Sequence, residues 1–160
     1  MSFKELVLDT NVVLDWLVFT DHSLNLLMSA LAMGSVTLVS HEAAEAELQR
    51  VVTYPLLNLN AVRQANVLST YQAQTRRAQL PDGFTLQNLM LPAGFPRCRD
   101  PDDQLFLALA FHAGAALVSR DRAVLSLTQR VRRFGVQIVT VPQLVTWLAK
   151  EGISISHHDG

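Results

Sequence analysis

The sequence contains a single cysteine, Cys98, and no uninterrupted hydrophobic run long enough to cross a membrane. One cysteine excludes an internal disulfide framework, and a membrane span needs about 18–20 consecutive apolar residues. The N-terminus lacks the layout of a signal peptide, because Lys4 and Glu5 are followed only by a short apolar stretch. These absences predict a protein of the reducing cytoplasm with no membrane partner.

The sequence also lacks an excess of either charge, since the net charge of the 160 residues is −1 at neutral pH. No overall attraction to nucleic acid follows from it, although most of the cations are Arg and local patches remain possible. We find no internal repeat, low-complexity tract or linker that would define a second domain. A hydrophobic fraction of 49% and a charged fraction of 17% argue against disorder. We expect one domain over residues 1–150 and a loose tail over 151–160.

Short apolar runs alternate with helix-like patterns along the chain. This alternation predicts an α/β fold, a three-layer sandwich with a central, mainly parallel sheet. Strands are expected at 6–10, 35–40, 115–119 and 136–140, and helices at 12–19, 24–33, 41–53, 60–78, 101–113, 121–129 and 143–150.

Capping residues predict where several helices begin. Ser40 can cap the helix that follows it, and Asp100 can cap a helix whose first turn contains Pro101. Residues 79–97 contain several Pro and Gly and are expected to be irregular, with a short strand at 84–86.

Two predicted strands end next to an acidic residue. Asp9 ends the first strand, and Asp121 follows the strand at 115–119. If these strands are neighbours in a parallel sheet, both side chains emerge at the same edge, where ligand sites of such sheets lie. Either residue alone is equally compatible with an ordinary turn or helix cap.

Further acids lie on two predicted helices. Asp100, Asp102 and Asp103 crowd one helix start, which is more than a cap requires, but chain order places that start away from the strand ends unless its loop folds over. Glu47 lies on the helix at 41–53, together with Glu42 and Glu45, and spacing alone does not choose among the three.

Clustered carboxylates need neutralisation. Two of them about 4 Å apart repel by roughly 4 kcal/mol at an effective dielectric constant near 20. A divalent cation or partial protonation makes such a cluster tolerable. Oxygen ligands without Cys or His favour Mg²⁺ or Mn²⁺, which can activate water for phosphoryl displacement.

Four short motifs occur in order: Leu-Asp-Thr-Asn-Val at 8–12, Ala-Glu-Leu at 46–48, Cys-Arg-Asp-Pro-Asp-Asp at 98–103 and Val-Ser-Arg-Asp at 118–121. In this order they resemble the acidic motifs of PIN domains, over residues 5 to about 148. The chain is most similar to the bacterial branch of VapC-like toxin components of toxin–antitoxin pairs.

The resemblance implies a metal-dependent endoribonuclease. It implies that the family's acids fall on Asp9, Glu47, Asp103 and Asp121, which would hold one or two Mg²⁺ or Mn²⁺ ions. It further implies an RNA substrate and an antitoxin protein that blocks the site. The resemblance also implies supporting roles for Asn11, Asp100 and Ser119.

Arginines flank the acidic motifs, and RNA phosphates need cations near an acidic pocket. Arg99 and Arg120 are therefore candidate substrate contacts. Arg120 stands where the family usually has Gly, so it can contact phosphate, crowd the site or point outward. Gln104 stands where an acid is common, and the stretch before Glu47 is one residue longer than expected, which keeps Glu45 as an alternative ligand.

These departures leave a second hypothesis, a catalytically inactive PIN-like module that binds RNA or protein. The helix at 60–78 and the apolar positions of 12–33 offer a surface for a partner or a second copy, so we expect a homodimer or higher oligomer. Cys98 has no nearby base and is expected to be structural. His157 and His158 are expected to bind metal only adventitiously.

Overall fold

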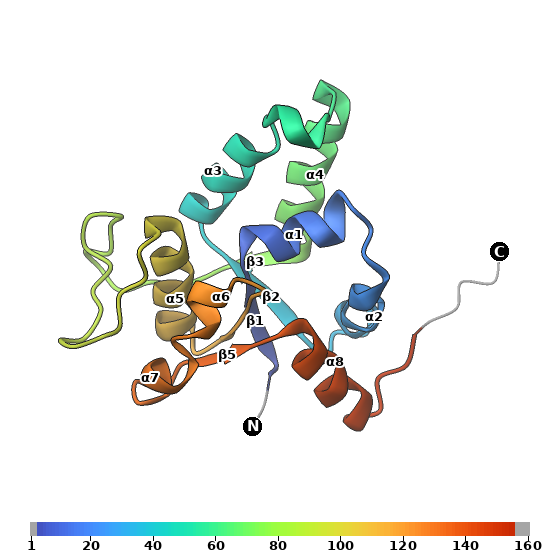
Figure 1. The fold of residues 1–160 in the computed structure, drawn as a ribbon. Helices are drawn as coiled ribbons and strands as arrows, with labels where there is room; N and C mark the ends of the chain where they lie inside the picture. Colours follow the sequence, from blue (N-terminus) through green and yellow to red (C-terminus); the bar gives the residue numbers. More distant parts are fainter. Residues whose placement is uncertain (1–2, 156–160) are drawn as a thin grey trace.

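A computed structural model describes residues 3–155, and a parallel sheet forms its centre (Figure 1). The sheet has five strands in the order β3-β2-β1-β4-β5, and every neighbouring pair is parallel. The strands are β1 (Glu5–Leu8), β2 (Thr37–Ser40), β3 (Thr75–Arg77), β4 (Ala116–Val118) and β5 (Gln137–Val139).

Helices connect and cover these strands. They are α1 (Thr10–Leu17), α2 (Asn25–Ala32), α3 (Glu42–Val51), α4 (Ala61–Gln74), α5 (Pro101–Ala113), α6 (Arg122–Leu125), α7 (Thr128–Arg132) and α8 (Val141–Lys150), with 3-10 turns η1 (His22–Leu24) and η2 (Pro55–Leu57). Within residues 3–155, none of them is both long and apolar enough to cross a membrane.

The central strand β1 divides the hydrophobic core into two layers, because successive side chains of a strand point to opposite faces. Leu6 and Leu8 pack with α1, α2 and α8 on one face, whereas Val7 packs with α5 and the α6–α7 segment on the other. Figure 1 shows α5, α6 and α7 grouped on one side of the sheet and α2 and α8 on the other. The predicted three-layer α/β sandwich is confirmed, and its sheet is entirely parallel.

The pairing of β1 with β4 positions the acidic strand ends. Leu8 lies opposite Val118 in the register, so the residues that follow them leave the sheet side by side. The Asp9 amide continues the pairing by donating to the Val118 carbonyl at 3.2 Å. The expectation that the two acid-bearing strands are neighbours is confirmed.

Helix α5 follows its predicted boundaries. Asp100 caps its N-terminus and Pro101 occupies the first turn, as expected. Gly114 ends it with φ of 65°, a left-handed conformation that glycine adopts without steric cost.

Three local predictions were wrong. The helix predicted at 60–78 ends at Gln74, and Thr75–Arg77 forms the edge strand β3 beside β2. No apolar alternation marks this strand, because Arg76 and Arg77 are exposed and bind carboxylates, Glu5 at 2.6 Å and Glu45 at 2.7 Å respectively. Its position depends on backbone pairing and these ion pairs, which short-range patterns do not reveal.

The other two errors involve His41 and Phe84. The cap of α3 is His41 and not Ser40, because the His41 Nδ1 accepts from the Ala43 amide at 3.1 Å. Residues 84–86 form no strand, since Phe84 instead lies edge-on between the rings of His41 and His112, with centroids 5.5 and 5.6 Å away.

The chain beyond α8 is described only in part. Ile153 packs against the core, and its amide donates to the Leu148 carbonyl at 3.1 Å. The remainder of the predicted tail from residue 156, including His157 and His158, lies outside the described residues.

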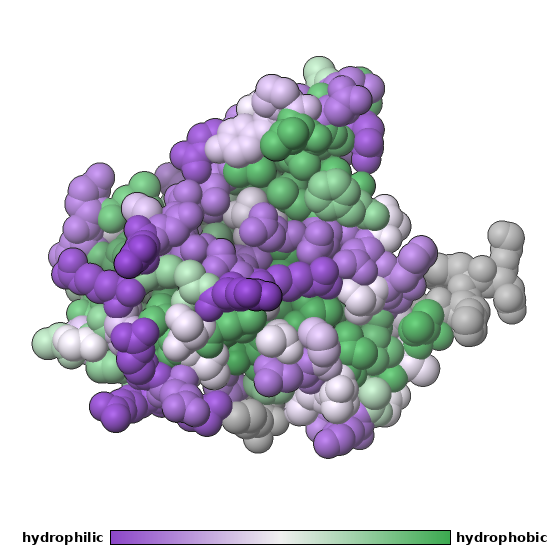
Figure 2. All heavy atoms as spheres, viewed as in Figure 1, coloured by the Kyte–Doolittle hydropathy of each residue, from purple (hydrophilic) through white to green (hydrophobic). Residues whose placement is uncertain are grey.

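Several large apolar side chains are exposed on the segments expected to meet a partner. They include Phe19, Met33 and Val62. Figure 2 shows hydrophobic surface over the ends of α3 and α4, above a hydrophilic band across the middle of the molecule. Oligomerisation stays a prediction.

The two-sided core makes β4 sensitive to truncation. We expect Leu117→Ala to lower the free energy of unfolding by about 2–5 kcal/mol, because Leu117 is fully buried and the substitution leaves a cavity. Leu56→Ala is the matched control; Leu56 is 98% exposed and should change stability by less than about 0.5 kcal/mol. Urea unfolding measures both, and equal losses would contradict the core assignment.

Candidate active site

Asp9 links the end of β1 to the start of α1. As the cap of α1, its Oδ1 accepts from the Val12 amide at 3.0 Å, and its Oδ2 accepts from the Ser119 hydroxyl at 2.5 Å. The residue is only 3% exposed. Burial raises the pKa of Asp9, while these hydrogen bonds oppose that rise by favouring the carboxylate.

Ser119 connects two of the predicted acids. It follows β4 and is fully buried, and its backbone amide donates to the Val139 carbonyl at 3.1 Å. The hydroxyl that donates to Asp9 also accepts from the Asp121 amide at 3.1 Å. One buried hydroxyl therefore fixes the position of Asp9 relative to the backbone of Asp121.

Asp121 and Asp103 belong to different helix starts, and the charge of Asp121 acts on Asp103. Asp121 caps α6 through its Oδ1, which accepts from the Ala123 amide at 2.7 Å. Asp103 lies in the first turn of α5. Burial raises the pKa of Asp103 to about 6, helped by the negative charges of Asp100, Asp121 and Asp9.

The start of α5 lies near the carboxyl ends of β1 and β4, which corrects the expectation from chain order. Helix α5 ends at Gly114, just before β4 begins, so the helix starts at the opposite end of that strand. The helix of a parallel crossover returns along the sheet, and this brings Asp103 to the edge that carries Asp9 and Asp121. No unusual folding of the preceding loop is needed.

Glu47 is supplied by a further helix, α3. Its Oε2 is buried and has no hydrogen-bond partner among the described residues. Burial raises the pKa of Glu47 to about 7; Asp102 and Asp100 add to this rise, and contact with Thr10 opposes it. Glu45 points elsewhere, because its Oε2 lies 2.7 Å from Arg77 Nη2. The structure thus distinguishes two glutamates that spacing could not.

The four predicted acids line one cavity of about 310 Å³, which we call the acidic cavity. Asn11 and Asp100 line it too, and its remaining wall is apolar or aromatic except for Thr10. The complete lining is Asp9, Thr10, Asn11, Leu14, Glu47, Val51, Tyr54, Leu56, Leu57, Asp100, Asp103, Phe106 and Asp121. Sequence reasoning missed Thr10, although it is the hydroxyl residue next to Asp9, and it missed the apolar wall supplied by α3 and η2.

The four acids line the same cavity, but their side chains are not positioned to coordinate one metal ion. Over residues 3–155, no three His, Cys, Asp or Glu side chains are already arranged to hold one metal ion. A common ion would have to draw some of these carboxylates inward.

The predicted supporting acid Asp100 caps α5, and its Oδ1 accepts from the Asp102 amide at 2.9 Å. Asp102 does not line the acidic cavity and binds Arg50 of α3 at 3.2 Å. The three acids at this helix start therefore have different contacts: one caps the helix, one makes an ion pair and one, Asp103, is half-buried beside the other acids.

The two candidate substrate arginines differ in their surroundings. Arg120 Nη1 lies 3.2 Å from Asp15 and 3.0 Å from Asp21, and its Nη2 donates to Ser23. It joins the α6 side of the site to α1 and η1. Arg99 is exposed and makes no ion pair within the described residues. Substrate contact by either residue stays a prediction.

Gln104 and Cys98 have structural contacts. The Gln104 Oε1 accepts from the Cys98 amide at 2.6 Å, and its Nε2 donates to the Pro96 carbonyl at 3.1 Å. The Cys98 thiol lies 3.9 Å from Asp103 Oδ2, and burial raises its pKa, so the reactive thiolate is disfavoured.

Comparison with known proteins adds a family to this geometry. The PIN domain family matches residues 5–123. This range contains all four predicted acids and every strand and helix start except those of α7, β5 and α8. No curated protein matches the chain. PIN domains are generally nucleases that use divalent metals. With most of its length covered by the match, the chain belongs to the PIN domain family.

Proposed function

We propose that this protein is a divalent-metal-dependent endoribonuclease whose acidic cavity is the active site. The observation that carries the proposal is the convergence of Asp9, Glu47, Asp103 and Asp121 on one cavity from four separate elements. The pairing of β1 with β4 brings Asp9 and Asp121 together, α5 adds Asp103, and α3 adds Glu47. The proposal places the whole activity in one PIN-like domain over residues 1–150.

The chemistry of the cavity suits Mg²⁺ or Mn²⁺. Its acidic donors are all oxygen, which these hard cations prefer. The buried Oε2 of Glu47 lacks a partner, and an unpaired buried polar atom is unfavourable unless a ligand satisfies it. Burial and neighbouring carboxylates also hold the pKa of Asp103 above its usual range. A bound cation would relieve both conditions.

The four carboxylates would hold the ion, which would supply an activated water and neutralise charge on the phosphodiester. The chain's own residues keep these ligands in place. Ser119 and the Val12 amide orient the Asp9 carboxylate, so that it loses little freedom when a substrate arrives. Leu14, Val51 and Leu57 form an apolar part of the cavity wall.

The first prediction concerns activity. Asp9→Asn should lower the rate of RNA cleavage by about 100-fold or more, because it removes the charge of a proposed metal ligand, and EDTA should abolish cleavage. Asp82→Asn is the control, since Asp82 is exposed on the loop before α5. A gel assay with Mg²⁺ or Mn²⁺ measures the rates. Cleavage that survives both EDTA and Asp9→Asn would refute the proposal.

A second prediction uses pH and stability. The raised pKa of Glu47 means that the folded state binds its proton more tightly, so this residue's contribution to stability falls as the pH rises from about 4.5 to 7. Glu47→Gln removes that loss. Without metal, it should therefore stabilise the protein at pH 8 relative to wild type by about 1 kcal/mol, discounted for half exposure, and by much less at pH 4.

Thermal unfolding at both pH values measures this difference, and Mg²⁺ separates it from simple packing. Mg²⁺ should raise the melting temperature of wild type more than that of Glu47→Gln, because a ligand of the folded state stabilises by mass action. Glu45→Gln is the control; it loses the ion pair with Arg77, which does not line the acidic cavity, and should keep the full response to Mg²⁺. An unchanged Mg²⁺ response in Glu47→Gln would exclude Glu47 as a ligand.

A catalytically inactive PIN-like module that binds RNA or protein is the second candidate. One observation favours it: no three acids are already arranged for an ion over residues 3–155. Gln104 also favours it: this residue stands where the family often has an acid, and its side-chain amide binds backbone atoms of Cys98 and Pro96. An inactive module would show no stabilisation by Mg²⁺ or Mn²⁺ and no cleavage.

The biological role that we propose is the toxin of a toxin–antitoxin pair, which rests on the likeness of the motifs to VapC-like proteins. A small antitoxin would then cover the acidic cavity, where the exposed Leu56 offers apolar contact. Induced expression of wild type in bacteria should stop growth, and Asp9→Asn should not. Normal growth under wild-type expression, with nuclease activity shown in vitro, would reject the toxin role alone.

A further inference from the structure

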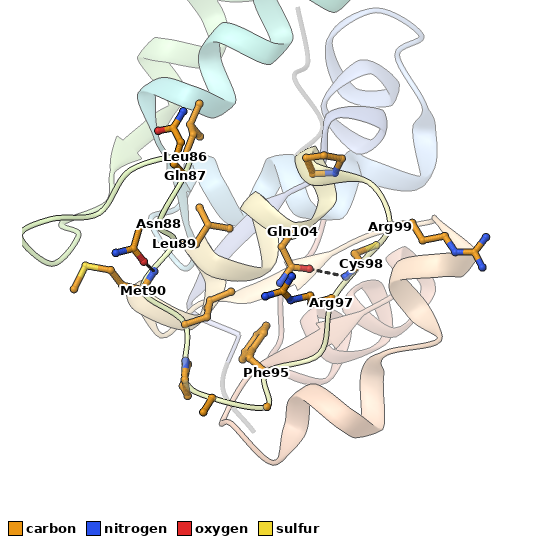
Figure 3. Close-up of a pocket in the computed structure, with 15 residues that line it drawn as sticks. Leu86, Gln87, Asn88, Leu89, Met90, Phe95, Arg97, Cys98, Arg99 and Gln104 are labelled. Atoms are coloured by element: carbon orange, nitrogen blue, oxygen red, sulfur yellow. Dashed lines mark hydrogen bonds between the residues drawn. The ribbon is translucent and has the colours of Figure 1, made fainter.

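A second cavity lies beside the acidic cavity and is the larger of the two, at about 500 Å³. We call it the loop cavity, because the irregular segment between β3 and α5 forms most of it (Figure 3). Its lining is residues 86–95 together with Arg97, Cys98, Arg99, Pro101 and Gln104. Its volume is in the range of ordinary ligand pockets.

The two cavities share one wall. Arg99, Pro101 and Gln104 line the loop cavity, while Asp100 and Asp103 from the same stretch line the acidic cavity. Adjacent residues at the start of α5 therefore face different cavities. An RNA strand bound at the acidic cavity would therefore lie next to the loop cavity.

The loop is held in shape although it contains no regular structure. Phe95 is buried and packs on Phe111 and Phe134, with ring centroids 5.7 and 5.1 Å away. His112 on α5 donates to the Leu89 carbonyl at 2.8 Å, and Gln104 fixes the backbone at residues 96 and 98. A cavity with such anchors exists before any ligand binds, which limits the entropy lost on binding.

A turn at the tip completes the wall. The Thr85 amide donates to the Asn88 carbonyl at 3.0 Å, and the Asn88 amide donates to the Thr85 carbonyl at 3.1 Å. The Asn88 Oδ1 accepts from the Met90 amide at 3.1 Å. Met90 has a positive φ of 53°. These bonds leave the Asn88 amide group and the Gln87 side chain available for new polar contacts.

Two arginines without an ion pair among the described residues lie at or beside this cavity. Arg50, Arg76, Arg77 and Arg120 are all tied to carboxylates of the chain. Arg97 and Arg99 are exposed and have no ion pair within residues 3–155. In Figure 3, Arg97 lies beside Gln104 in the cavity, whereas Arg99 projects away from it. Arg97 is thus a cation free to meet a phosphate inside the loop cavity.

We propose that the loop cavity binds a nucleotide of single-stranded RNA next to the cleaved phosphodiester, with Arg97 contacting its phosphate. The inference rests on the proposed nuclease function and names a subsite for it. Exposed apolar surface from Leu86 and Met90 can pack against a base, and the amides of Gln87 and Asn88 can hydrogen-bond its edge. Such contacts require an unpaired base, because the bases of an RNA duplex are stacked and paired.

The test compares cleavage of RNA substrates of different length. One substrate is a dinucleotide, and two others extend it by three nucleotides on the 5′ or the 3′ side. For wild type, one of the two extensions should lower KM relative to the dinucleotide. Arg97→Ala should abolish that benefit, raising KM for the extended RNA by about 5-fold with little change in kcat, as expected for a lost contact of about 1 kcal/mol.

Two further variants separate charge from space. Arg132→Ala is the matched control, because Arg132 is also exposed and without an ion pair in the described residues but lies at the end of α7. It should leave the benefit of the extension unchanged. Ala93→Trp fills the loop cavity without changing charge, and it should also abolish the benefit. Thermal unfolding shows whether each variant is folded.

Salt dependence gives an independent measurement. The slope of log affinity against log salt for the extended RNA should fall by about 0.7 in Arg97→Ala, as for one lost phosphate contact on a single strand. Wild-type slopes and KM values in both Arg97→Ala and Ala93→Trp would overturn the subsite while leaving the nuclease proposal standing. Wild type that cleaves none of the three RNAs would overturn the nuclease proposal, and the subsite with it.

Discussion

Carboxylates crowded at the edge of a parallel sheet are the constraint on which the proposed site depends. Burial is the main cost of ionising Asp9 and Asp103, and the negative charge of Asp121 adds to that cost for both. Folding alone does not require this arrangement, since burying neighbouring like charges is unfavourable. The fold tolerates it because the surrounding core is extensive: β1 and β4 are buried on both faces, and their apolar side chains fill two layers. The buried sheet therefore supplies most of the stabilising apolar burial. The carboxylates at its C-terminal edge can then remain charged and attract a cation.

Three acids of the cavity lining also have ordinary local roles as helix caps. Asp9, Asp100 and Asp121 cap α1, α5 and α6, each through a carboxylate oxygen that accepts a backbone amide. A cap fixes the direction of the side chain relative to its helix, and the order of strands and helices then fixes the helices relative to one another. Structural and chemical roles are therefore compatible at the same residue. Ser119 extends this principle, because its hydroxyl connects the carboxylate of Asp9 with the backbone that positions Asp121.

The sequence predicts this edge better than it predicts the rest of the fold. Apolar strands that stop at Asp9 and near Asp121 identify the edge, since period and burial are local signals. The position of α5 follows from its cap and from Gly114. Strand β3 could not be found in this way, because its two arginines are held by ion pairs with residues far away in the chain. Glu47 and Glu45 likewise differ only through tertiary contacts: Arg77 on β3 engages one, and the other faces the cavity.

The distribution of arginine pairing carries this reasoning from the fold to recognition. A net charge of −1 suggests no affinity for a polyanion, yet net charge averages over cations in different states. Arginines that bind carboxylates on the framework have their charge neutralised and their geometry fixed, as Arg120 does between Asp15 and Asp21. Arginines without such partners keep their charge for a ligand. Among those next to the acidic cavity, Arg97 lies in a loop held by aromatic packing and by Gln104, so its charge is presented from a defined position. In the proposed nuclease, the acidic cavity and its positive neighbour would act together: the acids would hold the cation, and the loop cavity would hold the RNA strand that the cation must meet.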